Sequence, residues 1–114
     1  MPDCIFCRIA GGEIPAAKVH DSEHLLAFRD VNPQAPVHIL IIPKRHVESV
    51  LALQEADSPL VGEIHFLAAR LARDEGIADS GFRLVTNTNA AAGQSVPHLH
   101  FHLLGGRPMG WPPG

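Results

Sequence analysis

The sequence predicts an α+β domain in which a mostly antiparallel five-stranded sheet carries one main helix across a face. The first observation is segment 98–104, where three histidines alternate with large apolar residues at the period of a half-buried β-strand. The second is segment 58–75, whose apolar residues recur at helical spacing. The connections before and after this helix are short, which argues against a doubly wound parallel sheet.

The N-terminal part predicts a short helix and a hairpin. Residues 4–10 suit a helical turn, which the glycine pair at 11–12 then breaks. Residues 18–21 and 25–28 are separated by the polar turn 21–23, so they predict two antiparallel strands joined tightly.

The middle of the chain predicts one strand and the main helix. Residues 32–36 form a loop stiffened by two prolines, and the β-branched segment 37–42 predicts a strand that Pro43 ends. Ser58 suits the N-cap of the helix and Pro59 its first position. The apolar stripe and the glycine that stops the helix are Leu60, Ile64, Leu67, Ala68, Leu71 and Gly76.

The C-terminal part predicts two more strands around a polar loop. Residues 82–86 form the first strand and residues 87–97 the loop. The histidine strand 98–104 follows and is closed by the glycine pair at 105–106.

Length and charge limit the function. The 114 residues suffice for one domain, over 1–114, and are too few for two. A net charge of −3 without a basic stripe argues against nucleic acid and membrane surfaces as partners. No signal segment or bilayer-spanning run is visible, so we expect a cytoplasmic protein. Two cysteines in that reducing compartment argue against a structural disulfide.

The three alternating histidines predict chemistry. On a regular strand His98 and His102 lie about 13 Å apart, too far for all three rings to bind one metal ion. We therefore interpret His100 as a nucleophile flanked by two rings that orient it or move protons. His38, in a neighbouring predicted strand, is a candidate for fixing its tautomer. The alternative is three solvated histidines on an exposed strand.

The loop before the histidines has the composition of an anion site. Gly93 and small side chains let backbone N–H groups approach a ligand, and successive N–H groups can form an anion nest. Asn87, Gln94 and Ser95 add neutral donors. A phosphate beside His100 would use both features, although most loops of this composition bind nothing.

Residues 98–104 match the pattern His-φ-His-φ-His-φ-φ, with φ apolar, at every position and so resemble the histidine triad (HIT) family of nucleotide hydrolases and transferases. The rest of the chain looks like the Hint branch (histidine triad nucleotide-binding proteins) in its bacterial, CxxC-containing form. The matching segments are Ile5-Phe6, Glu13-Ile14-Pro15, Ala27-Phe28, Asp30, Pro33-Gln34-Ala35-Pro36, His38, Ile42-Pro43-Lys44, His46, Gly93-Gln94-Ser95-Val96, Leu104-Gly105-Gly106-Arg107 and Trp111-Pro112-Pro113-Gly114.

The resemblance implies a HIT fold and a homodimer whose subunits join their sheets edge to edge. It implies binding of a purine nucleoside monophosphate and hydrolysis of the P–N bond in 5′-phosphoramidates such as adenosine phosphoramidate and aminoacyl- or lysyl-AMP. His100 would attack the α-phosphorus and form a nucleotidyl-histidine that water hydrolyses, with no cofactor needed for the chemistry.

The resemblance also assigns roles to single residues. His102 matches a histidine on the phosphate side that takes part in proton transfer, and His38 matches one that orients the catalytic ring. Asp30 matches the carboxylate that accepts the ribose hydroxyls, although an aspartate here equally suits the start of a turn. The implied catalytic set is His38, Ser95, His100 and His102.

The remaining implied contacts with the nucleotide fall into three groups. Apolar residues line the base, although each is equally suited to plain core. Trp111 would reach toward the partner subunit's site. The phosphate loop and the base residues are Asn87, Gly93, Gln94, Ser95 and Val96, and Phe6, Ile9, Phe28 and Val31.

Cys4 and Cys7 form a C-x-x-C pair. Zinc would need two more ligands, and His46 and His98 are available. The resemblance implies a structural zinc on these four residues, which leaves His100 free for catalysis. The alternative is two buried thiols that act as small hydrophobes.

Two other functions remain open. One is dinucleoside polyphosphate hydrolysis, as in the Fhit branch of the same family. The other is a zinc-stabilised nucleotide-binding or interaction module in which catalysis is incidental. The loop 93–96 and the tail 111–114 favour the Hint branch over the Fhit branch.

Overall fold

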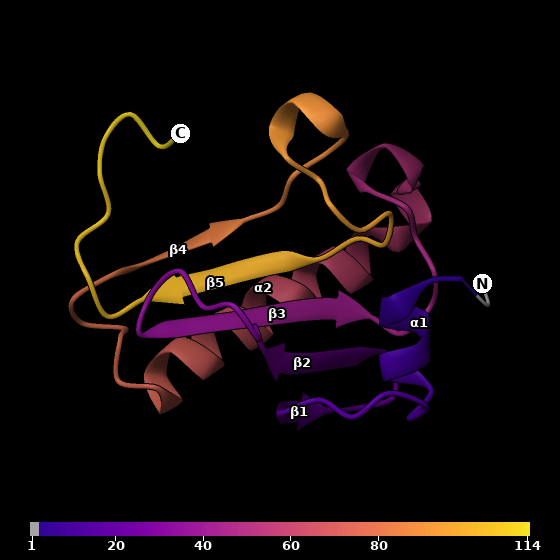
Figure 1. Ribbon diagram of the computed structural model, residues 1–114, viewed down its shortest axis with the longest axis horizontal. Coiled ribbons are helices and arrows are strands. Elements are labelled where there is room, and N and C mark those ends of the chain that lie inside the picture. The colour runs from indigo at the N-terminus through magenta and orange to yellow at the C-terminus, as the bar shows by residue number, and fades with distance from the viewer. Residues whose placement is uncertain (1–2) are drawn as a thin grey trace.

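The computed structural model describes residues 3–114 and confirms the α+β fold, with five antiparallel strands in the order β1-β2-β3-β5-β4 (Figure 1). No helix in this range is long and apolar enough to cross a bilayer. The strands are β1 (Lys18–Asp21), β2 (Leu25–Arg29), β3 (Val37–Pro43), β4 (Phe82–Val85) and β5 (Phe101–Gly105). The helices are α1 (Ile5–Ala10) and α2 (Ser58–Asp74), with 3-10 turns η1 (Val50–Ala52), η2 (Glu55–Asp57) and η3 (Ala90–Ala92).

The central strands bury apolar side chains on both faces of the sheet. In β2, Leu25 and Ala27 belong to the core beneath α2, which runs behind the sheet in Figure 1. Leu26 and Phe28 point the other way, into a smaller core beneath α1. This division follows from the alternation of side chains along a strand. It gives the sheet one face packed by the long helix and a second face only partly covered.

The ends of α2 follow from local chemistry, with one correction. The prediction that Ser58 is the N-cap is wrong by one residue: Asp57 takes that position because η2 runs directly into α2. The Ser58 hydroxyl instead donates to the Glu55 carbonyl over 2.6 Å. Gly76 ends the helix as predicted, in the left-handed conformation (φ +74°) that glycine adopts without strain.

The histidine strand is shorter than predicted. β5 begins at Phe101, so of the three alternating histidines only His102 lies in the sheet, opposite Leu40 of β3. The preceding residues leave the ladder because their backbone bonds elsewhere: the Leu99 N–H donates to the Val47 carbonyl over 2.6 Å. The alternating residues Leu99, Phe101 and Leu103 are buried in the core beneath α2, as a half-buried strand requires, but the histidines do not form one straight row.

Candidate active site and metal-ligand cluster

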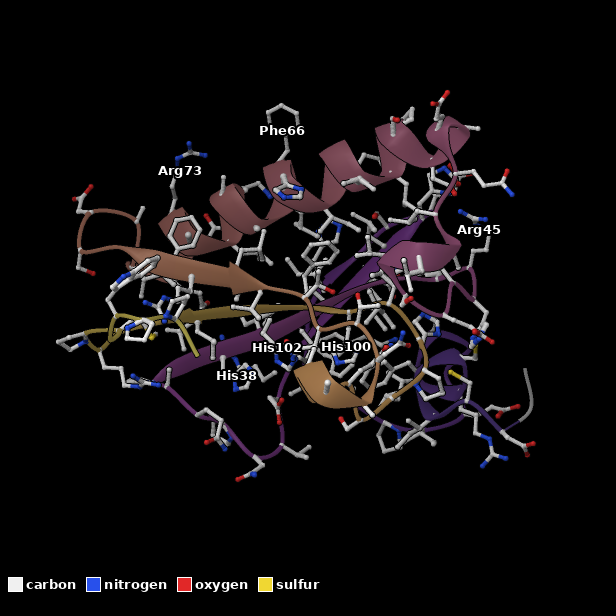
Figure 2. All side chains as sticks on the ribbon, turned by 90° about the horizontal axis from the view of Figure 1, so that it is seen from above. His38, Arg45, Phe66, Arg73, His100 and His102 are labelled. Carbon is white, nitrogen blue, oxygen red and sulfur yellow. The ribbon has the colours of Figure 1, made fainter. Side chains whose placement is uncertain are left out.

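Three histidines meet on the face of the sheet beneath α1 (Figure 2). His38 of β3 and His102 of β5 lie on neighbouring strands, with 2.9 Å between His38 Nε2 and His102 Nδ1. The His100 ring lies beside His102, with 5.0 Å between the ring centroids. His38 and His100 are buried, and His102 is half-buried. The interpretation of three solvated histidines on an exposed strand is therefore wrong.

The main chain fixes the tautomer of His100. Its Nδ1 lies 2.7 Å from the carbonyl oxygen of His98, and because a carbonyl only accepts, Nδ1 carries the hydrogen. The neutral ring therefore has its lone pair on Nε2, as a nucleophile requires. The prediction that His38 orients this ring is wrong, since the side chain of His38 bonds to His102 instead.

Two hydrogen bonds in series fix the tautomer of His102. The Gln34 backbone N–H donates to His38 Nδ1 over 3.0 Å, so His38 carries its hydrogen on Nε2 and donates it to His102 Nδ1. His102 then carries its own hydrogen on Nε2. Burial lowers the pKa of His38 despite the nearby Asp30 carboxylate. Burial, together with His100 and His38, lowers the pKa of His102 to about 4, so both rings are neutral at pH 7.

A pocket of about 440 Å³ opens over His100 and His102. Its polar lining also includes Arg29, Asp30 and Ser95, and the rest is apolar. The apolar lining consists of Ile5, Phe6, Ile9, Ile14, Pro15, Ala16, Ala17, Phe28, Val31, Leu40 and Val96. The four base-side residues expected from the sequence are all among them. Leu40 was findable, because strand alternation places it on the same face as His38, whereas residues 14–17 carry no periodic signal.

Asp30 lies at the polar end of this pocket and has two contacts. Its Oδ1 accepts the Asn32 N–H over 2.8 Å, which is the turn-starting contact considered from the sequence. Its Oδ2 lies 3.4 Å from His38 Nε2. Since His38 is neutral and donates its Nε2 hydrogen to His102, this second contact is not an ion pair. The turn and the site therefore share one carboxylate.

The Gln94 amide is engaged within the protein. Its Oε1 accepts the Asn89 N–H over 2.8 Å, and its Nε2 donates to the carbonyls of Glu48 (2.8 Å) and Val96 (3.1 Å). An amide nitrogen has two hydrogens, so no donor remains for a phosphate. Ser95 lines the pocket, whereas Gln94 braces the loop that carries it.

Asn89 adopts a strained backbone conformation at the start of η3. Its φ of 67° and ψ of 178° fall in a region occupied almost only by glycine. A non-glycine residue there costs about 1–3 kcal/mol, so the surroundings must hold it. Sequence reasoning missed this residue, because an Asn-Ala-Ala-Ala run gives no sign of strain.

Three other predicted nucleotide contacts lie outside the pocket lining. Asn87 and Gly93 flank η3, and Gly93 has the left-handed φ of 86° that allows the loop to turn. Trp111 is 85% exposed, in the C-terminal tail. Its expected contact with a partner subunit stays a prediction.

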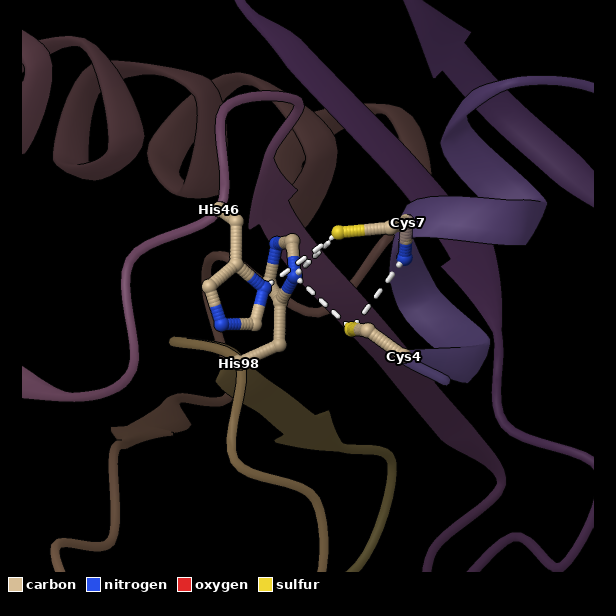
Figure 3. A group of neighbouring side chains, drawn as sticks. All are labelled: Cys4, Cys7, His46 and His98. Atoms are coloured by element: carbon tan, nitrogen blue, oxygen red, sulfur yellow. Dashed lines mark hydrogen bonds between the residues drawn. The ribbon is translucent and has the colours of Figure 1, made fainter. Parts of the chain in front are cut away.

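Cys4, Cys7, His46 and His98 form a separate cluster, drawn in Figure 3. Cys4 Sγ lies 3.3 Å from His98 Nδ1, and Cys7 Sγ lies 3.3 Å from His46 Nδ1 and 3.5 Å from His98 Nδ1. All four ligand atoms lie within 4.8 Å of one another. A tetrahedral zinc ion with ordinary bond lengths separates sulfur from nitrogen by about 3.6 Å. The four side chains therefore have close to the spacing that such an ion requires.

The outer hydrogen bond of His98 also suits a metal. His98 Nε2 lies 2.8 Å from the Pro43 carbonyl, so it carries the hydrogen and leaves the Nδ1 lone pair facing the thiols. Burial and the Cys4 thiol raise the pKa of the Cys7 thiol, a cost that a bound divalent cation offsets. The donor set and its tautomers thus fit zinc.

Asp30, His38 and His102 also place one ligand atom each within 4.8 Å of the others. Their hydrogen bonds argue against a metal. Because the Gln34 N–H points at His38 Nδ1, the only hydrogen of that ring lies on Nε2, where a metal would need a lone pair. This group is therefore a hydrogen-bonded relay, and of the two groups found among residues 3–114 the Cys4 cluster is the one that suits an ion.

Comparison with known proteins identifies the family. The HIT domain family matches residues 11–109 of the chain. An uncharacterised HIT-like protein of Synechocystis is 52% identical over 112 residues, covering 98% of this chain and 97% of its own. A HIT family hydrolase structure from Legionella pneumophila has 52% identity and a TM-score of 0.97, covering 98% of this chain and 100% of its own. A histidine triad nucleotide-binding protein from Candida albicans has 31% identity and a TM-score of 0.81, covering 96% and 83%. The chain belongs to the HIT domain family.

Proposed function

We propose that this chain is a nucleotide-binding hydrolase of the Hint branch. It cleaves the P–N bond of purine nucleoside 5′-phosphoramidates, such as adenosine phosphoramidate and aminoacyl- or lysyl-AMP, through a nucleotidyl group on His100. The observation that carries the proposal is the pair of complementary tautomers in one pocket: His100 offers a lone pair and His102 an N–H. The apolar end of the pocket suits a flat purine.

In the first step His100 Nε2 attacks the α-phosphorus. The bond from Nε2 to phosphorus forms as the P–N bond of the substrate breaks, and the departing nitrogen takes one proton from water and leaves as an amine. The hydrogen bond from His100 Nδ1 to the His98 carbonyl strengthens as the ring gains positive charge. The main chain therefore stabilises the charged intermediate more than the free ring.

In the second step water attacks the same phosphorus from the opened side. The bond to His100 Nε2 breaks, the water loses a proton to solvent, and the nucleoside monophosphate leaves. His100 returns to its neutral form with hydrogen on Nδ1. One proton is taken up in the first step and one is released in the second, so the cycle balances.

His102 acts as a neutral hydrogen-bond donor to the phosphoryl oxygens. Its Nδ1 already accepts a hydrogen from His38, so loss of the Nε2 hydrogen would leave an imidazolate. The pKa of about 4 supports a neutral ring at pH 7. A fixed N–H aimed at developing negative charge is the electrostatic contribution typical of such sites. We therefore assign His102 to charge stabilisation rather than to the proton transfer expected from the resemblance.

The same proposal includes a zinc ion and a homodimer. Cys4, Cys7, His46 and His98 would hold the zinc, which supplies structural cross-linking and no step of the reaction. For the cytoplasmic homodimer, the support is the edge position of β4 in the sheet, which suits strand pairing between two copies. A monomer mass by light scattering at micromolar concentration would contradict the dimer.

The test is release of AMP from adenosine 5′-phosphoramidate by the wild type and by His100→Ala, with intact-mass analysis after quenching in alkaline denaturant, because a phosphorus–imidazole bond is labile in acid. We expect turnover and a nucleotidyl adduct in the wild type and neither in the variant. Equal rates would exclude His100 as the nucleophile. Turnover of dinucleoside polyphosphates in place of the phosphoramidate would favour the Fhit-like reaction. Nucleotide binding without turnover of any substrate would favour a binding module.

A further inference from the structure

We infer that Gln94 is a positioning residue that holds the phosphate loop in its binding shape by forcing Asn89 into its strained conformation. The inference rests on the nucleotide-binding function proposed above. The first support is that all three hydrogen bonds of the Gln94 amide go to the main chain, at Asn89, Glu48 and Val96. A side chain whose hydrogen bonds all go to the backbone constrains the path of the chain.

The second support is the conformation of Asn89. Nothing in its own side chain caps η3, and its φ and ψ are those of a glycine. Its N–H is held by Gln94 Oε1, and its carbonyl accepts the N–H of Ala92 and that of Gln94, each over 3.2 Å. Gln94 therefore hydrogen-bonds to both the N–H and the carbonyl of Asn89, through its side chain and its own backbone N–H, across the turn η3. Without these hydrogen bonds, Asn89 would relax toward an ordinary extended or helical backbone conformation.

The third support is the position of Ser95 within this arrangement. Ser95 lies between Gln94 and Val96, and the Gln94 side chain bonds to the Val96 carbonyl, so it spans the residue that lines the pocket beside His100. The bond to Glu48 ties the loop to the segment two residues after His46. Gln94 thus positions the loop relative to the reacting phosphorus without contacting the substrate itself.

The experiment compares the dissociation constants of AMP and adenosine, because the loop faces the phosphate and adenosine lacks one. The variants are Gln94→Leu, Asn89→Gly and the double variant. The control is Glu48→Gln, because Gln94 bonds to the backbone carbonyl of Glu48 and this substitution changes only its side chain. Gln94→Leu should weaken AMP binding about tenfold, the factor that corresponds to one or two net hydrogen bonds. Adenosine binding should change less than about twofold by the same reasoning.

Asn89→Gly should restore part of the AMP affinity in the Gln94→Leu background, because glycine occupies the same backbone region without strain. An equal loss for AMP and adenosine, no loss for either, or no restoration by Asn89→Gly would each overturn the inference. If Gln94→Leu does not fold, Gln94→Met takes its place, as it keeps the length of the side chain without charge and loses the acceptor for Asn89 and both donors. A wild type that binds AMP no better than adenosine would overturn the proposed function as well.

Discussion

The carbonyl oxygen of His98 accepts a hydrogen bond from Nδ1 of His100 over 2.7 Å, while the ring of His98 faces the thiols of Cys4 and Cys7. One residue therefore belongs to both clusters, through its side chain to the metal ligands and through its main chain to the nucleophile. Because an ion that holds the ring also restrains the peptide, metal binding and the orientation of His100 are mechanically linked.

Removal of one thiol should lower both the zinc content and the melting temperature of the protein. Cys7→Ser should lower bound zinc from about one equivalent per chain to a small fraction, since a hydroxyl is a poor zinc ligand. The melting temperature should fall by about 10 °C, because a tightly bound ion stabilises only the folded state. Metal analysis of untreated protein and a thermal melt measure the two effects. The exposed His24→Gln is the control, and less than about a tenth of an equivalent in the wild type would contradict the zinc site.

Removal of the His38 N–H should slow the reaction through His102. His38→Leu deletes the donor to His102 Nδ1, so His102 can place its hydrogen on either nitrogen and the donor aimed at the phosphate is lost part of the time. We expect kcat to fall by roughly 10²-fold, the order typical for one lost donor at a developing charge. His38→Gln carries an amide N–H and should recover part of the rate. Equal rates in the two variants would argue against the relay.

Stability should decrease as the pH falls below about 6.5, and His102 should account for part of that loss. Its pKa is about 4 in the folded protein and 6.5 in an ordinary environment, so between these values the unfolded chain binds more protons. The free energy of unfolding therefore drops with falling pH, by about 2 kcal/mol between pH 7.5 and pH 5 for this one group. Urea titrations of the wild type and His102→Asn at both pH values measure it. An undiminished pH dependence in the variant would show that other groups cause the loss.

Asp30 should affect ribose recognition separately from the turn it starts. Asp30→Asn keeps an acceptor for the Asn32 N–H, so the turn persists, but the amide is a poorer acceptor for two hydroxyls. KM for adenosine 5′-phosphoramidate should rise about tenfold, whereas KM for the 2′,3′-dideoxy substrate should stay the same. A parallel rise for both substrates would assign Asp30 to the turn and to His38 alone.

The fold was predictable because its elements carry strong local signals. The apolar stripe of α2, the turn at 21–23 and the alternation in residues 101–105 each specify one structure without knowledge of the rest. The start of β5 was not predictable in the same way. The alternation continues back to His98, but the Leu99 N–H finds its acceptor in Val47, which lies 52 residues earlier in the chain. A pattern of side chains cannot report where a backbone donor finds its partner.

The same distinction between side-chain pattern and backbone hydrogen bonding applies to the site. The resemblance to the HIT family pointed to the four metal ligands and to the base-side residues Phe6, Ile9, Phe28 and Val31, since a family motif records side-chain identity. The orientation of His100 and His102 depends instead on the His98 carbonyl, which any residue could supply, and on the Gln34 N–H, which any residue except proline could supply. The bracing role of Gln94 was hidden for a related reason, because its partners are all main-chain atoms.

The two packed faces of the sheet differ in what they contribute to recognition. The core beneath α2 contains none of the residues assigned to the nucleotide, whereas the face beneath α1 contains the base lining and two of the three clustered histidines on its strands. Residues such as Ile14 and Val31 can therefore vary with the ligand while Ile39 and Leu103 stay constant for the scaffold. A chain built in this way can acquire new substrates by exchanging exposed side chains at the rim of the pocket, such as Val31, with the core beneath α2 left intact.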